Sequence, residues 1–253
     1  MIDLHSHLLP AVDDGSRSVS QSVAVLEQMA ARGVTDICLT PHLTASRAEA
    51  GPPATWEPAW AALTAELAVP IRLHRGVEMM LDRPLSPDAA ADRRLTLAGS
   101  RYLLVEFTRM VAPTSAYHAL AHVASLGLVP LLAHPERYAC TTPQVAAAWK
   151  AAGAVLQVDA NTLFAQRTRG ERARALLAAG LADILAADNH GDSRTVTESY
   201  VHLCDLGAEG QADLLLRRNP AAILADGALD PVPSFSWRKP LLQRLRDLLT
   251  TEE

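Results

Sequence analysis

Cysteine and lysine are scarce in this sequence of 253 residues. Cys38, Cys140 and Cys204 are scattered and odd in number, which excludes a disulfide framework and a paired-thiolate metal site. Free thiols in a reducing cytoplasm are therefore expected. Lysine occurs only at Lys150, within a predicted helix, and at Lys239 near the end of the chain. This argues against a binuclear amidohydrolase, which commonly needs a carboxylated lysine at a strand end.

Long apolar runs and a strong charge imbalance are also absent. No run approaches the ~18 residues of a membrane-spanning helix, and no basic segment followed by an apolar one opens the chain. We therefore expect neither export nor membrane insertion. The net charge of −5 argues against a nucleic-acid partner. A hydrophobic content of 49% permits a sizeable core, and the length suits one α/β barrel domain over residues 1–253.

Seven short apolar segments alternate with helical patterns. The predicted strands cover residues 2–4, 34–40, 71–77, 102–105, 129–133, 154–158 and 184–187. The predicted helices cover about 16–32, 60–67, 114–126, 142–153 and 171–179, with a final amphipathic helix near 241–249. Alanine, glycine and proline between Ala45 and Pro58 predict a loop near the mouth of the fold. This rhythm predicts a parallel sheet covered by helices.

Side chains that can bind a metal ion gather where these strands end. They are His5, His7, His42, Glu78, Glu106, His134, Asp188 and His190. In an extended backbone His5 and His7 point to the same side, so both can reach one ion. An open sheet would keep the ends of distant strands apart, whereas a closed barrel brings every strand end to one mouth. A barrel is therefore predicted. Four other histidines, inside predicted helices or a strand, are assigned to structural or surface roles: His74, His118, His122 and His202.

Imidazole and carboxylate ligands without a thiolate suit Zn²⁺, Mn²⁺ or Fe. Their number exceeds what one four-coordinate ion uses, which predicts a cluster of two or three metals with bridging carboxylates. Such a cluster can activate water and hold a phosphoryl oxygen. Arg137, three residues beyond His134, and Arg194, six beyond Asp188, are placed to donate to a phosphate. The alternative for each arginine is a surface ion pair.

Seven motifs, in this order, resemble the PHP (polymerase and histidinol phosphatase) superfamily. They are Asp3-x-His5-x-His7, Asp13-Asp14-Gly15, Thr40-Pro41-His42, Gly76-Val77-Glu78, Leu104-Val105-Glu106-Phe107, Ala133-His134-Pro135-Glu136-Arg137 and Asp188-Asn189-His190. The His-Pro-Glu-Arg segment, with Leu9-Pro10 in the opening, is similar to the CpsB/CapC type. Members of that type are bacterial manganese-dependent protein-tyrosine phosphatases associated with capsular and exopolysaccharide synthesis. The resemblance extends from residue 2 to about residue 220.

The resemblance implies a distorted seven-stranded, TIM-like (β/α) barrel and two to three ions per chain, Mn²⁺ with Fe or Zn²⁺ as alternatives. The implied ligands are His5, His7, Glu78 and Asp188 for a first metal, Glu78, Glu106 and His134 for a second, and Asp14, His42 and His190 for a third. Asp14 is preferred to Asp13 because it directly precedes Gly15. Asp3 is expected to orient a ligand rather than to bind a metal.

Two positions depart from the family pattern. Met79 and Met80 stand where the family often has tyrosines, and Asn189 stands where it often has alanine. Neither change removes a ligand, so catalysis is expected to survive. Both leave the substrate preference open.

The leading hypothesis is hydrolysis of phosphotyrosine on a protein by a metal-bridged hydroxide at a trinuclear site, with Arg137 and Arg194 stabilising the phosphoryl oxygens. The Cys-x5-Arg loop of ordinary tyrosine phosphatases is absent, because the residues six positions beyond the cysteines are Thr44, Ala146 and Gly210. The resemblance suggests a polysaccharide-associated tyrosine kinase as partner.

Three alternatives stay open: a small-molecule phosphatase of the histidinol-phosphate kind, a TatD-like nuclease and a non-catalytic regulatory barrel. The oligomeric state is also open. One basic cluster either lines the mouth or forms a solvated helix face: Arg167, Arg169, Arg172 and Arg174.

Overall fold

The structure, a computed structural model, describes residues 1–237, so the helix predicted near 241–249 lies outside the described residues. All strand pairs in the described part are parallel, in a three-stranded sheet ordered β1-β2-β4 and a six-stranded sheet ordered β3-β5-β6-β7-β8-β9. The strands are β1 Ile2–Asp3, β2 Asp36–Leu39, β3 His42–Thr44, β4 Arg72–Arg75, β5 Glu78–Met80, β6 Tyr102–Glu106, β7 Val129–Ala133, β8 Val155–Asp159 and β9 Ile184–Ala186.

The predicted strands 34–40 and 71–77 are each followed, after a short break, by a second strand. β2 and β4 belong to the smaller sheet, whereas β3 and β5 belong to the larger one. Pro41 lies in the first break and has no N–H for a ladder, although its carbonyl accepts a hydrogen bond from Glu78 N at 3.1 Å. His42 and Glu78, expected just after strand ends, are therefore the first residues of β3 and β5, where they stand opposite each other in register.

The end of β1 lies beside the end of β9. Ser6 and Asn189 form an isolated parallel bridge. Asp188 N donates to His5 O at 3.0 Å, and His7 N donates to Asn189 O at 2.7 Å. The first and last strands of the described chain thus bring His5, His7 and Asp188 together.

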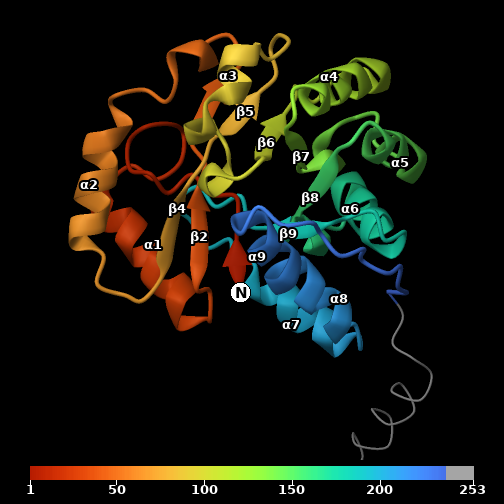
Figure 1. The fold of residues 1–253 in the computed structure, drawn as a ribbon. Helices are drawn as coiled ribbons and strands as arrows, with labels where there is room; N and C mark the ends of the chain where they lie inside the picture. The colour runs from red at the N-terminus through yellow and green to blue at the C-terminus, as the bar shows by residue number, and fades with distance from the viewer. Residues whose placement is uncertain (238–253) are drawn as a thin grey trace, which may run out of the picture.

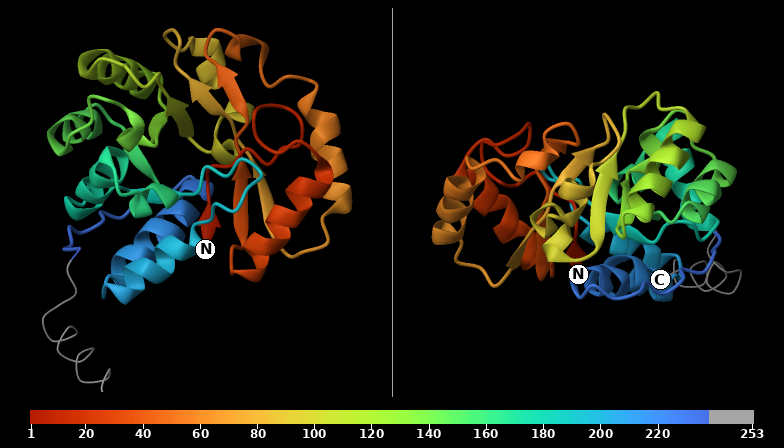
Figure 2. Two further views of the ribbon diagram at one scale, coloured as in Figure 1. Left: turned by 180° about the vertical axis from the view of Figure 1, so that it is seen from behind. Right: turned by 45° about the horizontal axis from the view of Figure 1, so that its top comes forward.

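Helices surround the strands in every view (Figures 1 and 2). They are α1 Val19–Ala31, α2 Trp56–Glu66, α3 Pro87–Ala91, α4 Pro113–Ser125, α5 Pro143–Ala151, α6 Thr168–Ala178, α7 Thr197–Asp205, α8 Glu209–Asp213 and α9 Asn219–Leu224. The loop predicted from Ala45 to Pro58 is shorter in the structure, because α2 begins at Trp56, and η1 (Ala48–Ala50) lies within it. Pro58 lies inside α2 because proline is tolerated in the first turn of a helix.

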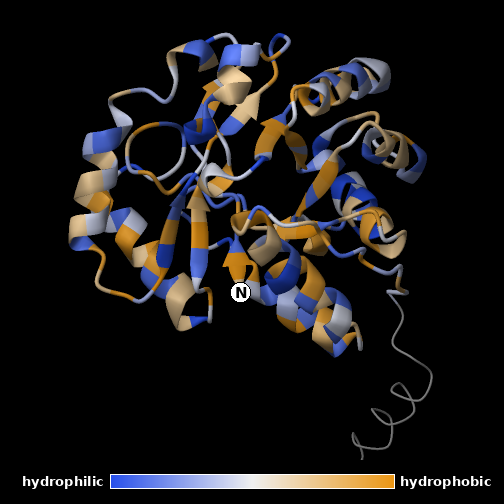
Figure 3. Cartoon of the chain, viewed as in Figure 1, coloured by the Kyte–Doolittle hydropathy of each residue, from blue (hydrophilic) through white to orange (hydrophobic). Residues whose placement is uncertain are grey.

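Two apolar clusters form the core. The larger lies between strands and helices and includes Leu103 and Val105 of β6. The smaller contains Leu104 of the same strand, with Leu4, Cys38, Leu131 and Ile184 among others. Since side chains alternate along a strand, the second cluster lies on the other face of β6, where Ile223 of α9 also joins it. Figure 3 shows the mostly apolar strands at the centre and the mixed surfaces of the helices around them. No helix of the described residues is long and apolar enough to cross a membrane.

Candidate metal centre

Four buried side chains, one from β5 and three from the segments after β1 and β9, converge on one point. His5 and His7 follow β1, Glu78 begins β5 and Asp188 follows β9. His5 Nε2 lies 3.2 Å from His7 Nε2, 3.1 Å from Glu78 Oε2 and 3.2 Å from Asp188 Oδ1. His7 Nε2 lies 3.1 Å from the same glutamate oxygen and 3.3 Å from the same aspartate oxygen. The four side chains therefore offer one ligand atom each to a common point.

The donor atoms have the spacing of metal ligands. Four atoms about 3.2 Å apart at the corners of a tetrahedron enclose a centre about 2.0 Å from each, which is the length of a metal–imidazole bond. Glu78 Oε2 and Asp188 Oδ1 are buried without a hydrogen-bond partner, although imidazole nitrogens stand within 3.3 Å of them. Such close approach without hydrogen-bond geometry leaves two buried oxygens unsatisfied, which a cation would correct.

Glu78 also reaches a second group of ligands. Its Oε1 lies 2.9 Å from His134 Nε2, and its Oε2 lies 3.1 Å from His42 Nδ1. Glu106 Oε1 lies 3.3 Å from His42 Nδ1, while Glu106 Oε2 lies 3.9 Å from His134 Nε2. The two oxygens of Glu78 thus face different partners, as a carboxylate that bridges two ions would.

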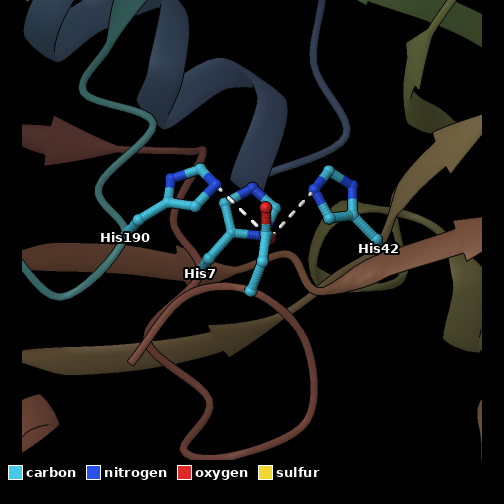
Figure 4. A group of neighbouring side chains, drawn as sticks. His7, His42 and His190 are labelled. Atoms are coloured by element: carbon cyan, nitrogen blue, oxygen red, sulfur yellow. Dashed lines mark ion pairs between the residues drawn. The ribbon is translucent and has the colours of Figure 1, made fainter. Parts of the chain in front are cut away.

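A third group contains His7, Asp14, His42 and His190. Asp14 Oδ1 lies 3.4 Å from His42 Nε2 and 3.5 Å from His190 Nε2. The rings of His42 and His190 both lie beside that of His7, with ring centroids 4.4 and 4.2 Å from it, and their dashed lines meet at a common point (Figure 4). His190 Nδ1 lies 3.0 Å from the carbonyl of Asp188, so it carries the proton and Nε2 is free to bind a metal.

The two adjacent aspartates occupy different positions. Asp13 Oδ2 accepts hydrogen bonds from His7 Nδ1 at 2.7 Å and from His42 N at 3.2 Å, and its Oδ1 accepts one from Gly15 N. The Asp14 side chain is 69% exposed and turns toward His42 and His190. Asp13 thus orients His7, and Asp14 is the aspartate that faces the third group of ligands.

Asp3 contacts the backbone of the site rather than a ligand ring. Its Oδ1 accepts hydrogen bonds from His5 N at 3.3 Å and Ala187 N at 3.1 Å, which ties β1 to the end of β9. Burial raises the pKa of Asp3 to about 7, against the opposing effect of these two N–H groups. The partner of the His5 ring is Gln157 of β8, whose Oε1 lies 3.0 Å from His5 Nδ1 and 3.3 Å from His134 N.

The sequence pattern did not single out Gln157, because a lone glutamine in an apolar strand carries no metal signal. The one feature of the sequence that could have indicated it is its place in a strand, two residues before Asp159. The amide is fully buried and acts through two ligand-bearing segments.

Arg137 and Arg194 both lie beside the outer oxygen of Asp188. Arg137 NH2 donates to Asp188 Oδ2 and, at 2.7 Å, to Asp159 Oδ2. Arg194 NH1 lies 3.6 Å from Asp188 Oδ2, and its Nε and NH2 pair with Asp192. Within the described residues, Nε and NH1 of Arg137 make no hydrogen bond. Both arginines are anchored at the site, and part of the Arg137 guanidinium stays available to an anion.

The electrostatics of the site favour positive charge between the carboxylates. Burial alone would raise the pKa of Glu78, but His5, His134 and His42 hold it well below its usual range. Burial lowers the pKa of His42, yet the carboxylates of Glu106 and Glu78 outweigh this effect and raise it to about 10. Protons and metal ions therefore compete for the same ligands.

Two of these side chains stand on left-handed backbone, His134 with φ of 34° and Asp188 with φ of 49°. Non-glycine residues rarely adopt this conformation, and such strain gathers at functional sites. Sequence patterns for strand ends do not reveal it.

The positions that depart from the family pattern have distinct surroundings. The amide of Asn189 donates to the carbonyls of Asp192 and Arg194, so this residue shapes the loop that carries Arg194. Met79 is fully buried. Met80 lines a cavity of about 1070 Å³ that His42 and Glu106 also border.

The four histidines assigned to structural or surface roles have other partners. His74 pairs with Asp36, and His122 bonds to Leu85 O. His118 contacts the ring of Tyr117, and His202 lies between the rings of Phe164 and Trp237.

Comparison with solved structures places the fold near those of two bacterial proteins. The chain superposes on the structure described as YwqE from Bacillus subtilis and CpsB from Streptococcus pneumoniae, unique metal-dependent tyrosine phosphatases, with a TM-score of 0.76. The sequences are 24% identical, and the match covers 93% of this chain and 100% of the other. The phosphotriesterase from Mycobacterium tuberculosis matches with a TM-score of 0.53 and 13% identity over 90% of this chain and 95% of that one.

Sequence comparison finds similar proteins in the same bacterial genera. The tyrosine-protein phosphatase YwqE of Bacillus subtilis is 28% identical over 235 residues, which is 86% of this chain and 92% of YwqE. The tyrosine-protein phosphatase CpsB of Streptococcus pneumoniae is 27% identical over 240 residues, 89% of this chain and 99% of CpsB. The family model for capsular polysaccharide synthesis, CpsB/CapC, matches residues 1–225. The family predicted from the motifs is therefore confirmed, and the chain belongs to the CpsB/CapC family of capsular polysaccharide synthesis.

Proposed function

We propose that this protein is a metal-dependent tyrosine-protein phosphatase that acts in capsule or exopolysaccharide synthesis. The observation that carries the proposal is a set of three overlapping groups of possible ligands, two of which share Glu78, beside two arginines. The relatives named above are tyrosine-protein phosphatases and share nearly the whole length of the chain. A polysaccharide-associated tyrosine kinase, or another phosphotyrosine protein of that machinery, would be the substrate.

The ligand set fits two to three ions. His5, His7, Glu78 and Asp188 would hold a first ion. Glu78, Glu106 and His134 would hold a second, although His42 lies closer to Glu106 than His134 does. Asp14, His42 and His190 would hold a third. Nitrogen and carboxylate donors without thiolate suit Mn²⁺, with Fe or Zn²⁺ as alternatives. Such ions, when bound, lower the pKa of a water and neutralise charge on phosphoryl oxygens.

The chain's own residues position the phosphate. Arg137 donates to Asp188 and Asp159 through NH2 only, so its Nε and NH1 can donate to two oxygens of a phosphoryl group. Arg194, anchored by Asp192, would approach the same group from the other side of Asp188. These fixed donors would stabilise the equatorial oxygens as charge redistributes in the transition state. Phenolate, with a pKa of about 10, leaves without a general acid.

The surroundings of the site have room for an aryl phosphate. A cavity of about 1070 Å³ opens beside His42 and Glu106, with apolar walls from Val12, Leu43, Trp56 and Met80 and polar ones that include Thr44, Ser46 and Arg47. A tyrosine ring would lie against the apolar walls, and the polar side chains would meet the peptide around it. The volume also admits residues that flank the tyrosine.

The fold that holds this site would be a distorted (β/α) barrel of the PHP type, one domain over the whole chain. Two features support closure: the bridge between Ser6 and Asn189, and the second apolar cluster, to which Leu104, Leu131 and Ile184 contribute from different strands. A ring of parallel strands has such an inner cluster.

A substrate panel tests the proposal. With Mn²⁺ present, the protein should hydrolyse phosphotyrosine peptides with a kcat/KM at least tenfold above that for histidinol phosphate, sugar phosphates and nucleotides, as a match between pocket and substrate predicts. Higher activity on a small polar phosphate would refute the substrate assignment, while hydrolysis of single-stranded DNA would favour the nuclease.

A further inference from the structure

The predicted basic cluster divides into two parts in the structure. Arg172 donates to the carbonyls of Tyr138 and Ala139, and Arg174 donates to those of Leu163 and Ala165. These two arginines hold α6 against its neighbours. Arg167 and Arg169, at the start of α6, make no side-chain hydrogen bond or ion pair within the described residues, and both are exposed.

Arg169 lies beside two other arginines. Arg172, one turn later on the same face of α6, contacts Tyr138 and Ala139 directly after Arg137 of η4 (Pro135–Arg137). Ala139 N donates to Arg109 O at 2.9 Å, which brings the loop after β6 to the same place. Partial burial and the charges of Arg109 and Arg137 lower the pKa of Arg169.

The three segments belong to one edge of the molecule. The loop with Arg109 follows β6, η4 follows β7, and the start of α6 follows β8 through η5 (Asn161–Phe164). Because β6, β7 and β8 are adjacent and parallel (Figure 1), these segments lie at the carboxyl ends of the strands. His134 and Asp188 lie at the same edge, because they follow β7 and β9.

The surface around Arg109 and Arg169 has the composition of an interaction site. Neither side chain makes a direct ion pair in the described chain, although the protein carries a net charge of −5. Glu136 and Asp159 are near enough to Arg169 to oppose the lowering of its pKa, but they do not outweigh it. Met110, next to Arg109, is 80% exposed. Arginine without a direct ion pair beside an exposed apolar side chain is typical of protein interfaces.

We propose that Arg109 and Arg169 form a docking surface for acidic residues of the substrate that flank the phosphotyrosine. This inference rests on the proposed phosphatase function and adds a substrate preference to it. The phosphoryl group would lie at Arg137, and carboxylates a few residues away along an extended peptide would meet Arg169 and Arg109. Complementary charge of this kind acts chiefly on the encounter with substrate and weakens with salt.

Three phosphotyrosine peptides of one length test the preference: one with Asp and Glu around the tyrosine, one with Asn and Gln at those positions, and one with Lys. The variants are Arg109→Gln, Arg169→Gln and the double variant. Arg218→Gln is the matched control, because this exposed arginine of η6 (Leu214–Arg218) pairs with Asp230 away from the metal ligands. Activity on p-nitrophenyl phosphate reports catalysis without docking.

The wild type should prefer the acidic peptide over the neutral one by about tenfold in kcat/KM, through KM, as two weak surface charge interactions allow. The double variant should lose this preference and keep its p-nitrophenyl phosphate activity, and Arg218→Gln should behave as the wild type. The preference should shrink as salt rises from 50 to about 500 mM. Equal rates on the acidic and neutral peptides, or a double variant with an unchanged preference, would overturn the docking surface. A wild type without activity on any of the peptides would instead overturn the proposed function.

Discussion

Replacement of Glu78 by glutamine tests the architecture of the site most severely. Oε2 of Glu78 lies 3.1 Å from a nitrogen of each of His5, His7 and His42, and Oε1 lies 2.9 Å from His134 Nε2. Glutamine has the same shape, but it is neutral, and its NH₂ group would face imidazole nitrogens that are meant to bind a cation. The change therefore removes a charge and one ligand atom without creating a cavity.

The expected size follows from the burial of the group. Removing one partner of a buried charge pair costs about 3–5 kcal/mol, and 1.4 kcal/mol is a factor of ten in affinity. Metal affinity should therefore fall by roughly two to three and a half orders of magnitude. At metal concentrations that just saturate the wild type, Glu78→Gln should hold at least one ion fewer per chain and lose nearly all turnover of p-nitrophenyl phosphate.

The assay combines elemental analysis after dialysis with turnover over a Mn²⁺ titration. Circular dichroism checks that the variant is folded. Glu198→Gln is the control, because Glu198 does not line the cavity beside His42, is 61% exposed and lies 3.9 Å from Arg32. Its metal content and turnover should match those of the wild type. A Glu78→Gln protein with wild-type metal content and turnover would refute the role of Glu78 as the shared ligand.

Two further predictions concern residues around this centre, and a third concerns an ion pair in another part of the molecule. Arg137→Ala should lower kcat/KM for an aryl phosphate by about 10²–10³-fold, with metal content retained; steady-state kinetics that equal the wild type would contradict its role on the phosphate. Gln157→Leu should weaken metal binding by about 10–100-fold, because His5 Nδ1 loses its partner, and Gln157→Glu should restore much of it; Mn²⁺ titrations compare the two. The pKa of Asp36 is lowered to about 2, because hydrogen bonds from Arg72 and His74 outweigh the effect of burial, so its contribution to stability is present above the unfolded pKa of about 4 and lost as pH falls toward 2. Between pH 4 and pH 2 the free energy of unfolding, measured with urea, should fall by about 1–2 kcal/mol less in Asp36→Asn than in the wild type, a value discounted for the exposure of Arg72. An equal fall in both proteins would contradict this prediction.

The gathering of the candidate ligands at one place could largely be predicted from the sequence. His5 and His7 are separated by one residue at the end of an apolar segment, and this spacing alone places both rings on one side of the strand. His134 and Asp188 also follow apolar runs, and parallel strands bring such positions to one edge. Local patterns suffice here because strand ends are defined by short stretches of the chain.

Contacts between distant segments could not be predicted in this way. Gln157 meets the His5 ring across 152 positions of the chain, and nothing near Gln157 in the sequence indicates that partner. The division of the second and third predicted strands depends on the hydrogen bond from Glu78 N to Pro41 O and on the pairing of His42 with Glu78, which are tertiary contacts. Likewise, Asp13 and Asp14 differ in exposure and partner, not in any local pattern.

The different partners of the four clustered arginines could not be predicted from the sequence either. Four arginines within eight positions of the chain look alike in sequence, yet Arg172 and Arg174 donate to backbone carbonyls. Arg169 makes no side-chain hydrogen bond or ion pair with residues 1–237. The distinction depends on which carbonyls the turn of α6 reaches. A helical repeat can tell which arginines share a face, but not what that face meets.

Phosphotyrosine hydrolysis should depend on metal held by this ligand set. To test this most directly, the protein is treated with a chelator, and the chelator is then removed. Turnover of a phosphotyrosine peptide is followed while Mn²⁺ is added back, and the number of ions bound per chain is measured. Turnover should vanish in the stripped protein and return in step with the second and third ions bound. Full turnover by a chain shown to hold fewer than one metal ion would contradict the account.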